Sequence, residues 1–163
     1  MPKLKQYFHI FLMVSGFSLF GISSAAEAQP TVTFTAIDGS AAEAGQETAG
    51  FSVTRTDDGN TAAILRVYVQ TGGTATIGSD YSTTNMGYVE PNVYFIDIRA
   101  NDLSTSVILT PVFEELEEGT ENILVTLLDP RGINDDYTVG SPSQVEVTIL
   151  DSQDLIFKDS FEQ

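Results

Sequence analysis

The chain has 163 residues, of which 42% are hydrophobic and 18% are charged, a composition typical of one globular domain. Seven Lys and Arg against 23 Asp and Glu give a net charge of −16, which argues against nucleic acids and anionic membrane surfaces as partners. There is no Cys, and the one His, His9, lies in a segment that we expect to be removed. Disulfides, Ser–His or Cys–His catalysis and ordinary zinc sites are therefore excluded.

The first 28 residues have the layout of a secretory signal peptide. Lys3 and Lys5 precede an uncharged apolar stretch over residues 10–22, and Ala26-Glu27-Ala28 places small residues at the −3 and −1 positions of a cleavage site. The alternative is a membrane anchor, but the apolar stretch is shorter than the roughly 20 residues that a span requires. We therefore predict an exported protein (periplasmic, cell-surface or secreted) that has no membrane span after cleavage.

From residue 31 onward the sequence predicts β-strands and almost no helix. Apolar and polar residues alternate in seven segments, and turn residues such as Asp57-Asp58-Gly59-Asn60 separate them. The segments are residues 31–36, 51–54, 65–70, 94–99, 106–111, 123–127 and 145–149. We predict an all-β fold, a seven-stranded antiparallel sandwich, in which residues 83–92 form a long loop, either a β-arch or a disordered excursion.

Carboxylates gather in the loops that such a sandwich would bring together. Residues 114–121 contain five of them, and Glu43, Asp80 and Asp151 lie in three other predicted loops. Loops between alternate strands share one end of a sandwich, where carboxylates repel one another unless a cation lies among them. Calcium is the natural counter-ion because it accepts many oxygen ligands in irregular geometry. The alternative is a solvated acidic surface, and the EF-hand pattern is absent.

Several motifs, in this order, resemble the Calx-beta family. They are Ser40-Ala41-Ala42-Glu43-Ala44-Gly45, the block G-T-A-T-I-G-S-D-Y over residues 73–81, Thr110-Pro111, the block L-E-E-G-T-E over residues 116–121, and residues 137–151. The resemblance covers residues 30–154. It implies a seven-stranded immunoglobulin-like sandwich whose loops at one end bind calcium. Carried over by position, the implied metal ligands are Glu43, Asp80, Glu114, Glu118, Glu121 and Asp151.

Two departures from the family pattern predict one weak calcium site in place of a multi-ion cluster. The family has two adjacent Asp after its T-P-[VI] motif, whereas this chain has Phe113 and Glu114, and its terminal acidic run is reduced to Asp151-Ser152-Gln153-Asp154. Fewer charged ligands weaken calcium binding. Residues 155–163 form a C-terminal tail that resembles the short I-F-x-D-G-F-E endings of exported bacterial proteins.

Three functions are consistent with a small acidic sandwich. The first is an exported calcium-binding interaction module for an unidentified protein or cell-surface partner, in which calcium orders the acidic loops. The second is a structural or adhesive sandwich with no useful calcium affinity. The third, an enzyme with paired carboxylates, is disfavoured because the chain has no Trp to bind sugars and no recognisable acid–base pair, G-x-S-x-G motif or phosphate loop. We therefore predict that the protein is not an enzyme.

Overall fold

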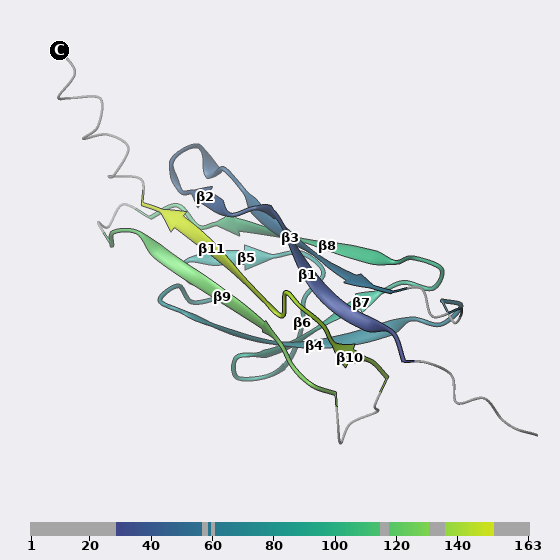
Figure 1. Ribbon diagram of the computed structural model, residues 1–163. Coiled ribbons are helices and arrows are strands. Elements are labelled where there is room, and N and C mark those ends of the chain that lie inside the picture. The colour runs from purple at the N-terminus through teal and green to yellow at the C-terminus, as the bar shows by residue number, and fades with distance from the viewer. Residues whose placement is uncertain (1–28, 57–58, 60, 115–117, 131–135, 152–163) are drawn as a thin grey trace, which may run out of the picture.

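The computed structural model describes residues 29–56, 59, 61–114, 118–130 and 136–151, which form eleven strands and one 3₁₀ turn in two facing sheets (Figure 1). The predicted all-β sandwich is confirmed. The predicted signal peptide (1–28), the tail (155–163) and most of the turn at 57–60 lie outside these ranges and stay predictions. No helix in the described ranges is long and apolar enough to cross a membrane.

The first sheet has the strand order β10-β1-β3-β8-β5. Its inner three strands pair antiparallel, whereas the short β10 joins β1 in parallel. The bounds are β1 Thr31–Asp38, β3 Ala49–Arg55, β5 Tyr81–Thr83, β8 Ser104–Pro111 and β10 Thr138–Val139.

The second sheet has the strand order β2-β11-β9-β4-β7-β6, with β2 parallel to β11 and every other pair antiparallel. The chain passes from the first sheet to the second at Gly39, and the 3₁₀ turn η1 (Ala44–Gln46) leads back to β3. The bounds are β2 Ser40–Ala42, β4 Leu65–Gly73, β6 Gly87–Glu90, β7 Val93–Ile98, β9 Glu121–Leu127 and β11 Gln144–Leu150.

The core lies between the sheets, because alternation sends every second side chain of each long strand inward. Ile123, Val125 and Leu127 of β9 show the pattern, since all three are buried. Phe34 and Phe51 meet edge to face across β1 and β3, with ring centroids 5.2 Å apart. The seven predicted strands are therefore present, as β1, β3, β4, β7, β8, β9 and β11.

Four short edge strands, β2, β5, β6 and β10, were not predicted. The prediction of a loop or arch over residues 83–92 was wrong in part, because β6 pairs with β7 there. Gly87 lies opposite Phe95, and a Cβ at Gly87 would lie 2.2 Å from the Phe95 ring. The Phe95 ring covers Gly87. Because glycine has no side chain, it interrupts the alternating pattern by which a strand is recognised in the sequence.

Arg55 holds together the end of the sandwich where β3 and β7 finish. Its side chain is buried, and its guanidinium donates hydrogen bonds to the carbonyl oxygens of Asp102 (2.9 Å), Thr61 (3.0 Å) and Arg99 (3.3 Å). The loops at 61–63 and 99–102 are thus joined to one buried cation. Charged donors make the stronger kind of hydrogen bond, so Arg55 joins these two loops firmly to the end of β3.

Candidate metal centre

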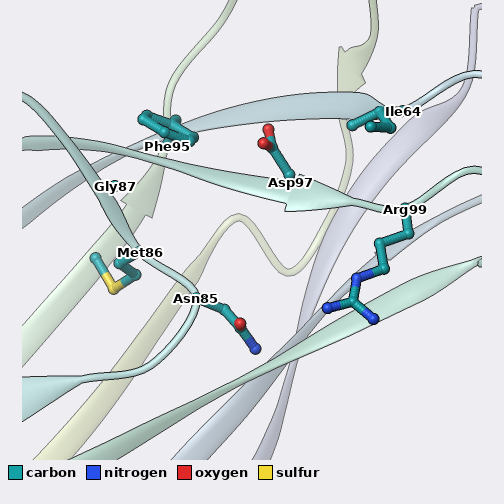
Figure 2. Close-up of a pocket in the computed structure, with 7 residues that line it drawn as sticks. All are labelled: Ile64, Asn85, Met86, Gly87, Phe95, Asp97 and Arg99. Carbon is teal, nitrogen blue, oxygen red and sulfur yellow. The ribbon is translucent and has the colours of Figure 1, made fainter.

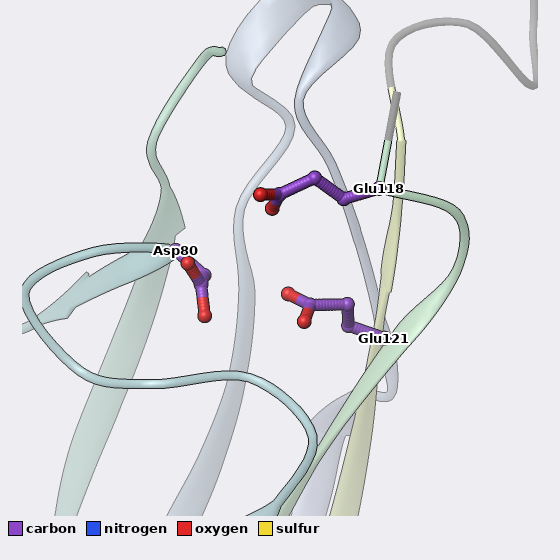
Figure 3. Close-up of side chains that lie close together, drawn as sticks. All are labelled: Asp80, Glu118 and Glu121. Carbon is purple, nitrogen blue, oxygen red and sulfur yellow. The ribbon is translucent and has the colours of Figure 1, made fainter. Parts of the chain in front are cut away.

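The six carboxylates predicted as ligands lie at strand ends that the topology brings to one end of the sandwich. Glu43 follows β2, Asp80 precedes β5, Glu114 follows β8, and Asp151 follows β11. Glu121 begins β9, and Glu118 lies three residues before it. In Figure 3 the side chains of Asp80, Glu118 and Glu121 point toward one another from two separate loops.

Three of these carboxylates form a compact acidic cluster, which we define as Asp80, Glu118 and Glu121. One carboxylate oxygen from each lies within 4.8 Å of those of the other two. Asp80 and Glu121 are half-buried, whereas Glu118 is exposed. Oxygens at this separation can reach a common cation after small side-chain rotations, and carboxylate oxygen is the donor that hard divalent cations prefer.

The Asp80 loop is ordered by its own backbone. The Thr76 amide donates to Asp80 Oδ2 (2.5 Å), the Asp80 amide donates back to the Thr76 carbonyl (2.9 Å), and the Val112 amide donates to the Asp80 carbonyl (2.8 Å). Gly78 has a φ of +92°, a conformation that glycine adopts without steric cost. The G-S-D-Y sequence therefore forms a tight turn that presents the Asp80 side chain to the cluster.

Asp151 organises the loop that carries Glu118. It is 1% exposed, and its Oδ2 accepts hydrogen bonds from the amides of Glu118 (2.7 Å) and Gly119 (2.9 Å). Gly119 has a φ of +78°, so the E-G-T-E motif needs glycine at this position. In this structure Asp151 acts as a hydrogen-bond acceptor for the loop, beside the cluster.

Reciprocal hydrogen bonds between Thr74 and Asn122, which we call the Thr74–Asn122 clamp, join the Asp80 loop to the Glu118 loop, and the sequence did not predict them. The Thr74 amide donates to Asn122 Oδ1 (3.0 Å), and the Asn122 amide donates to Thr74 Oγ1 (2.9 Å). Gly73 is required beside it, because its φ is +105° and a Cβ would lie 2.2 Å from the Asn122 carbonyl oxygen. The partners are 48 residues apart, so no local pattern in the sequence indicates the contact.

The remaining predicted ligands surround the cluster. Desolvation raises the pKa of the Glu118 carboxyl, and the charges of Glu114, Asp80 and Asp151 raise it further. Desolvation likewise raises the pKa of Glu121, with added contributions from Asp80, Glu118, Glu43 and Glu114. Each of the other four predicted carboxylates therefore raises the pKa of Glu118, of Glu121 or of both. Glu43 is 5% exposed, and Phe113, which replaces an acidic residue of the family pattern, is 54% exposed.

These raised pKa values predict a pH dependence in buffer that contains a metal chelator. Between the ordinary value of 4.5 and the raised values of Glu118 and Glu121, the folded protein binds more protons than the unfolded chain does. The free energy of unfolding should therefore increase as the pH falls from neutral through the raised pKa values, and level off near the ordinary value. Denaturant melts from pH 7 to pH 5 measure this, and the slope should flatten in Glu121→Gln. A wild-type stability that decreases over this range would contradict the prediction.

No protein-family model matches the chain, and no curated protein matches it. Among solved structures, the Calx CBD2 domain aligns with 80% of this chain and 95% of its own length, at 14% identity and a TM-score of 0.50. CBD12 from CALX1.2 aligns with 74% of this chain at 17% identity and a TM-score of 0.51. The calcium binding domain CBD12 of CALX1.1 gives 17% identity and a TM-score of 0.50. This chain spans 44% of each CBD12 structure.

These similarities agree with the resemblance indicated by the sequence motifs. At sequence identities of 14–17%, the similarity to these structures shows a shared fold and nothing further. The described part of the chain therefore has a Calx-beta-like immunoglobulin sandwich fold.

Proposed function

We propose that this protein is an exported calcium-binding module in which calcium orders the acidic loops at one end of the sandwich. The ordered loops would present a fixed surface to a protein or cell-surface partner. The observation that carries the proposal is the approach of Asp80, Glu118 and Glu121 to within 4.8 Å. A solved structure with a similar fold, CBD12 of CALX1.1, is a calcium binding domain.

The donor set of the cluster fits calcium better than magnesium. All of its side-chain donors are carboxylate oxygens from two separate loops, and calcium accepts six to eight oxygen ligands in irregular geometry. Magnesium requires near-ideal octahedral geometry and loses its water reluctantly. Asp151 and Glu43, both buried beside the cluster, would supply further oxygens or hold the loops in place. The Phe113 replacement removes one charged ligand, so we expect a Kd on the order of 10⁻⁴ to 10⁻³ M.

Isothermal titration of the chelator-treated protein with calcium tests the proposal directly. We expect saturable binding in the submillimolar to millimolar range, with magnesium binding more weakly. Asp80→Asn should weaken calcium binding at least tenfold, because it removes a charged ligand while its amide oxygen can still accept the Thr76 hydrogen bond.

The matched control is Asp102→Asn. Asp102 lies in the connection between β7 and β8, at the opposite end of β8 from Glu114. This variant should bind calcium as the wild type does. Absence of calcium binding by the wild type, in the presence of a folded β spectrum, would favour the alternative of a structural or adhesive sandwich without an ion.

Export is the second part of the proposal and rests on the sequence. Lys3, Lys5, the apolar stretch and Ala26-Glu27-Ala28 predict cleavage after Ala28. Mass spectrometry of the protein recovered from outside the cytoplasm should show a new N-terminus at Gln29. A cytoplasmic chain that begins at Met1 would contradict export and leave the calcium proposal to be judged by the titration alone.

A further inference from the structure

Two adjoining hollows lie on the side of the sandwich, away from the acidic cluster. Their volumes are about 400 and about 280 Å³, and both are lined by Asn85, Asp97 and Arg99. We call the two together the side groove. It runs from the connection between β5 and β6, across the outer face of β7, to the start of β8. It shares no residue with the acidic cluster, and each hollow is close to the size of small-molecule sites.

Side-chain contacts hold the floor of the side groove in place. Asp97 is held by Arg66 through two hydrogen bonds of 2.8 Å, and the Arg66 guanidinium also lies 3.8 Å from the centre of the Phe95 ring. The Asn85 side chain is fixed because its Nδ2 donates to the Ser106 carbonyl (2.9 Å). Groups held in place before binding lose less entropy on binding, which is the property of a preformed site.

Several polar side chains in the side groove have hydrogen-bond donors and acceptors that the described part of the protein does not use. Within the described ranges, the side chains of Arg99, Asp102, Ser104 and Ser106 make no hydrogen bond or ion pair. Figure 2 shows the Arg99 guanidinium and the Asn85 side chain extending toward one another, with Ile64 beside Asp97. The guanidinium offers five donors, the carboxylate of Asp102 only accepts, and the serine hydroxyls do both. At one end Met86 and Ile64, which is 63% exposed, add an apolar wall.

This mixture fits a neutral polyhydroxylated ligand better than a charged one. Arg99 and Asp102 bring opposite charges to the same hollow without forming an ion pair, and the charge of Asp97 is paired with that of Arg66. An anion would also meet the net charge of −16 of the whole chain. A sugar, in contrast, presents hydroxyls that donate and accept, together with apolar C–H faces. We propose that the side groove binds neutral glycans, with Arg99 and Asp102 contacting ring hydroxyls and Ile64 packing against a sugar face.

The Phe95 ring is covered by the Arg66 guanidinium, 3.8 Å from its centre, and also lies against Gly87, so it is not free to stack on a sugar. We therefore expect millimolar affinity for a trisaccharide, with hydrogen bonds as the main contribution. Because the groove and the cluster have no residue in common, glycan binding should be the same with calcium and with a chelator.

The test is an NMR titration of the ¹⁵N-labelled protein with maltotriose, cellotriose and N-acetylchitotriose. At least one should shift the amides of residues 85–87 and 102–106 in a saturable way. Arg99→Ala and Asp102→Ala should each weaken that binding about tenfold, the loss expected for one hydrogen bond to a charged group. Glu146→Gln, on β11 three strands away from β7 in the same sheet, should leave it unchanged.

If the NMR spectrum of a variant matches that of the wild type for residues outside the side groove, the variant is folded. The proposal is overturned if none of the three sugars shifts these amides, or if the shifts survive both substitutions. It is also overturned if only a sulfated trisaccharide or spermidine binds in the groove, since that would make it a site for charged ligands. Loss of binding on chelation would assign the sugar to the calcium loops and overturn it as well.

Discussion

Asp80→Asn should stabilise the ion-free protein and remove most of the stabilisation that calcium provides. The raised pKa values of Glu118 and Glu121 indicate that the carboxylates repel one another, and Asp80 contributes to both. Neutralising one of them relieves that repulsion. In the wild type, calcium at a hundredfold excess over Kd should add about 2.7 kcal/mol to the free energy of unfolding. For a domain of this size that is on the order of 10 °C in melting temperature.

Asp80→Asn should raise the stability of the ion-free protein and lower the stability gained from calcium. A loop that is unstable for a reason unrelated to a metal would not show both effects. Thermal melts with chelator and with 10 mM calcium, at constant ionic strength, should show the curves of wild type and Asp80→Asn changing order. Asp102→Asn should follow the wild type in both buffers, and magnesium should shift the wild type less than calcium does. If calcium and magnesium shift the wild-type melt equally, the acidic loops act as a solvated surface and the structural alternative is favoured.

The long strands were predictable because each one buries a full set of alternating side chains. Leu65, Val67 and Val69 of β4 are all buried, and the polar residues between them face outward. The short strands follow a different rule. β10 consists of Thr138 and Val139, both exposed, and it exists because it pairs with β1 more than a hundred residues earlier in the chain. Two residues cannot show a period, so pairing of this kind is invisible in the sequence.

The candidate site was likewise predictable only in part. The carboxylates were found by composition and by resemblance of local motifs, and Asp80, Glu118 and Glu121 do come together. What holds them is non-local. The Thr74–Asn122 clamp and the hydrogen bonds from the Glu118 loop to Asp151 join loops that are far apart in sequence. The sequence also gives no indication that Asp151 is buried and occupied by two amide donors, whereas Glu118 is exposed.

Phe51→Ala should cause a large loss of stability. Phe51 is fully buried between the sheets and meets Phe34 edge to face. Truncation of a buried Phe costs about 3–5 kcal/mol, from lost burial and from the cavity that remains. Domains of this kind have a total of about 5–15 kcal/mol, so the variant should unfold at a much lower urea concentration. Urea melts followed by circular dichroism measure the change.

The matched control for this substitution is Phe113→Ala, the same chemical change at a side chain that is 54% exposed. Its effect on the free energy of unfolding should stay within about 0.5 kcal/mol, as is usual at the surface. Phe51 lies in the core and the cluster lies in the loops, so the two contributions should add. Calcium should therefore stabilise Phe51→Ala by the same free energy as the wild type. A much smaller calcium effect in that variant would show that the loops depend on core packing for their order, and that the site is not preformed.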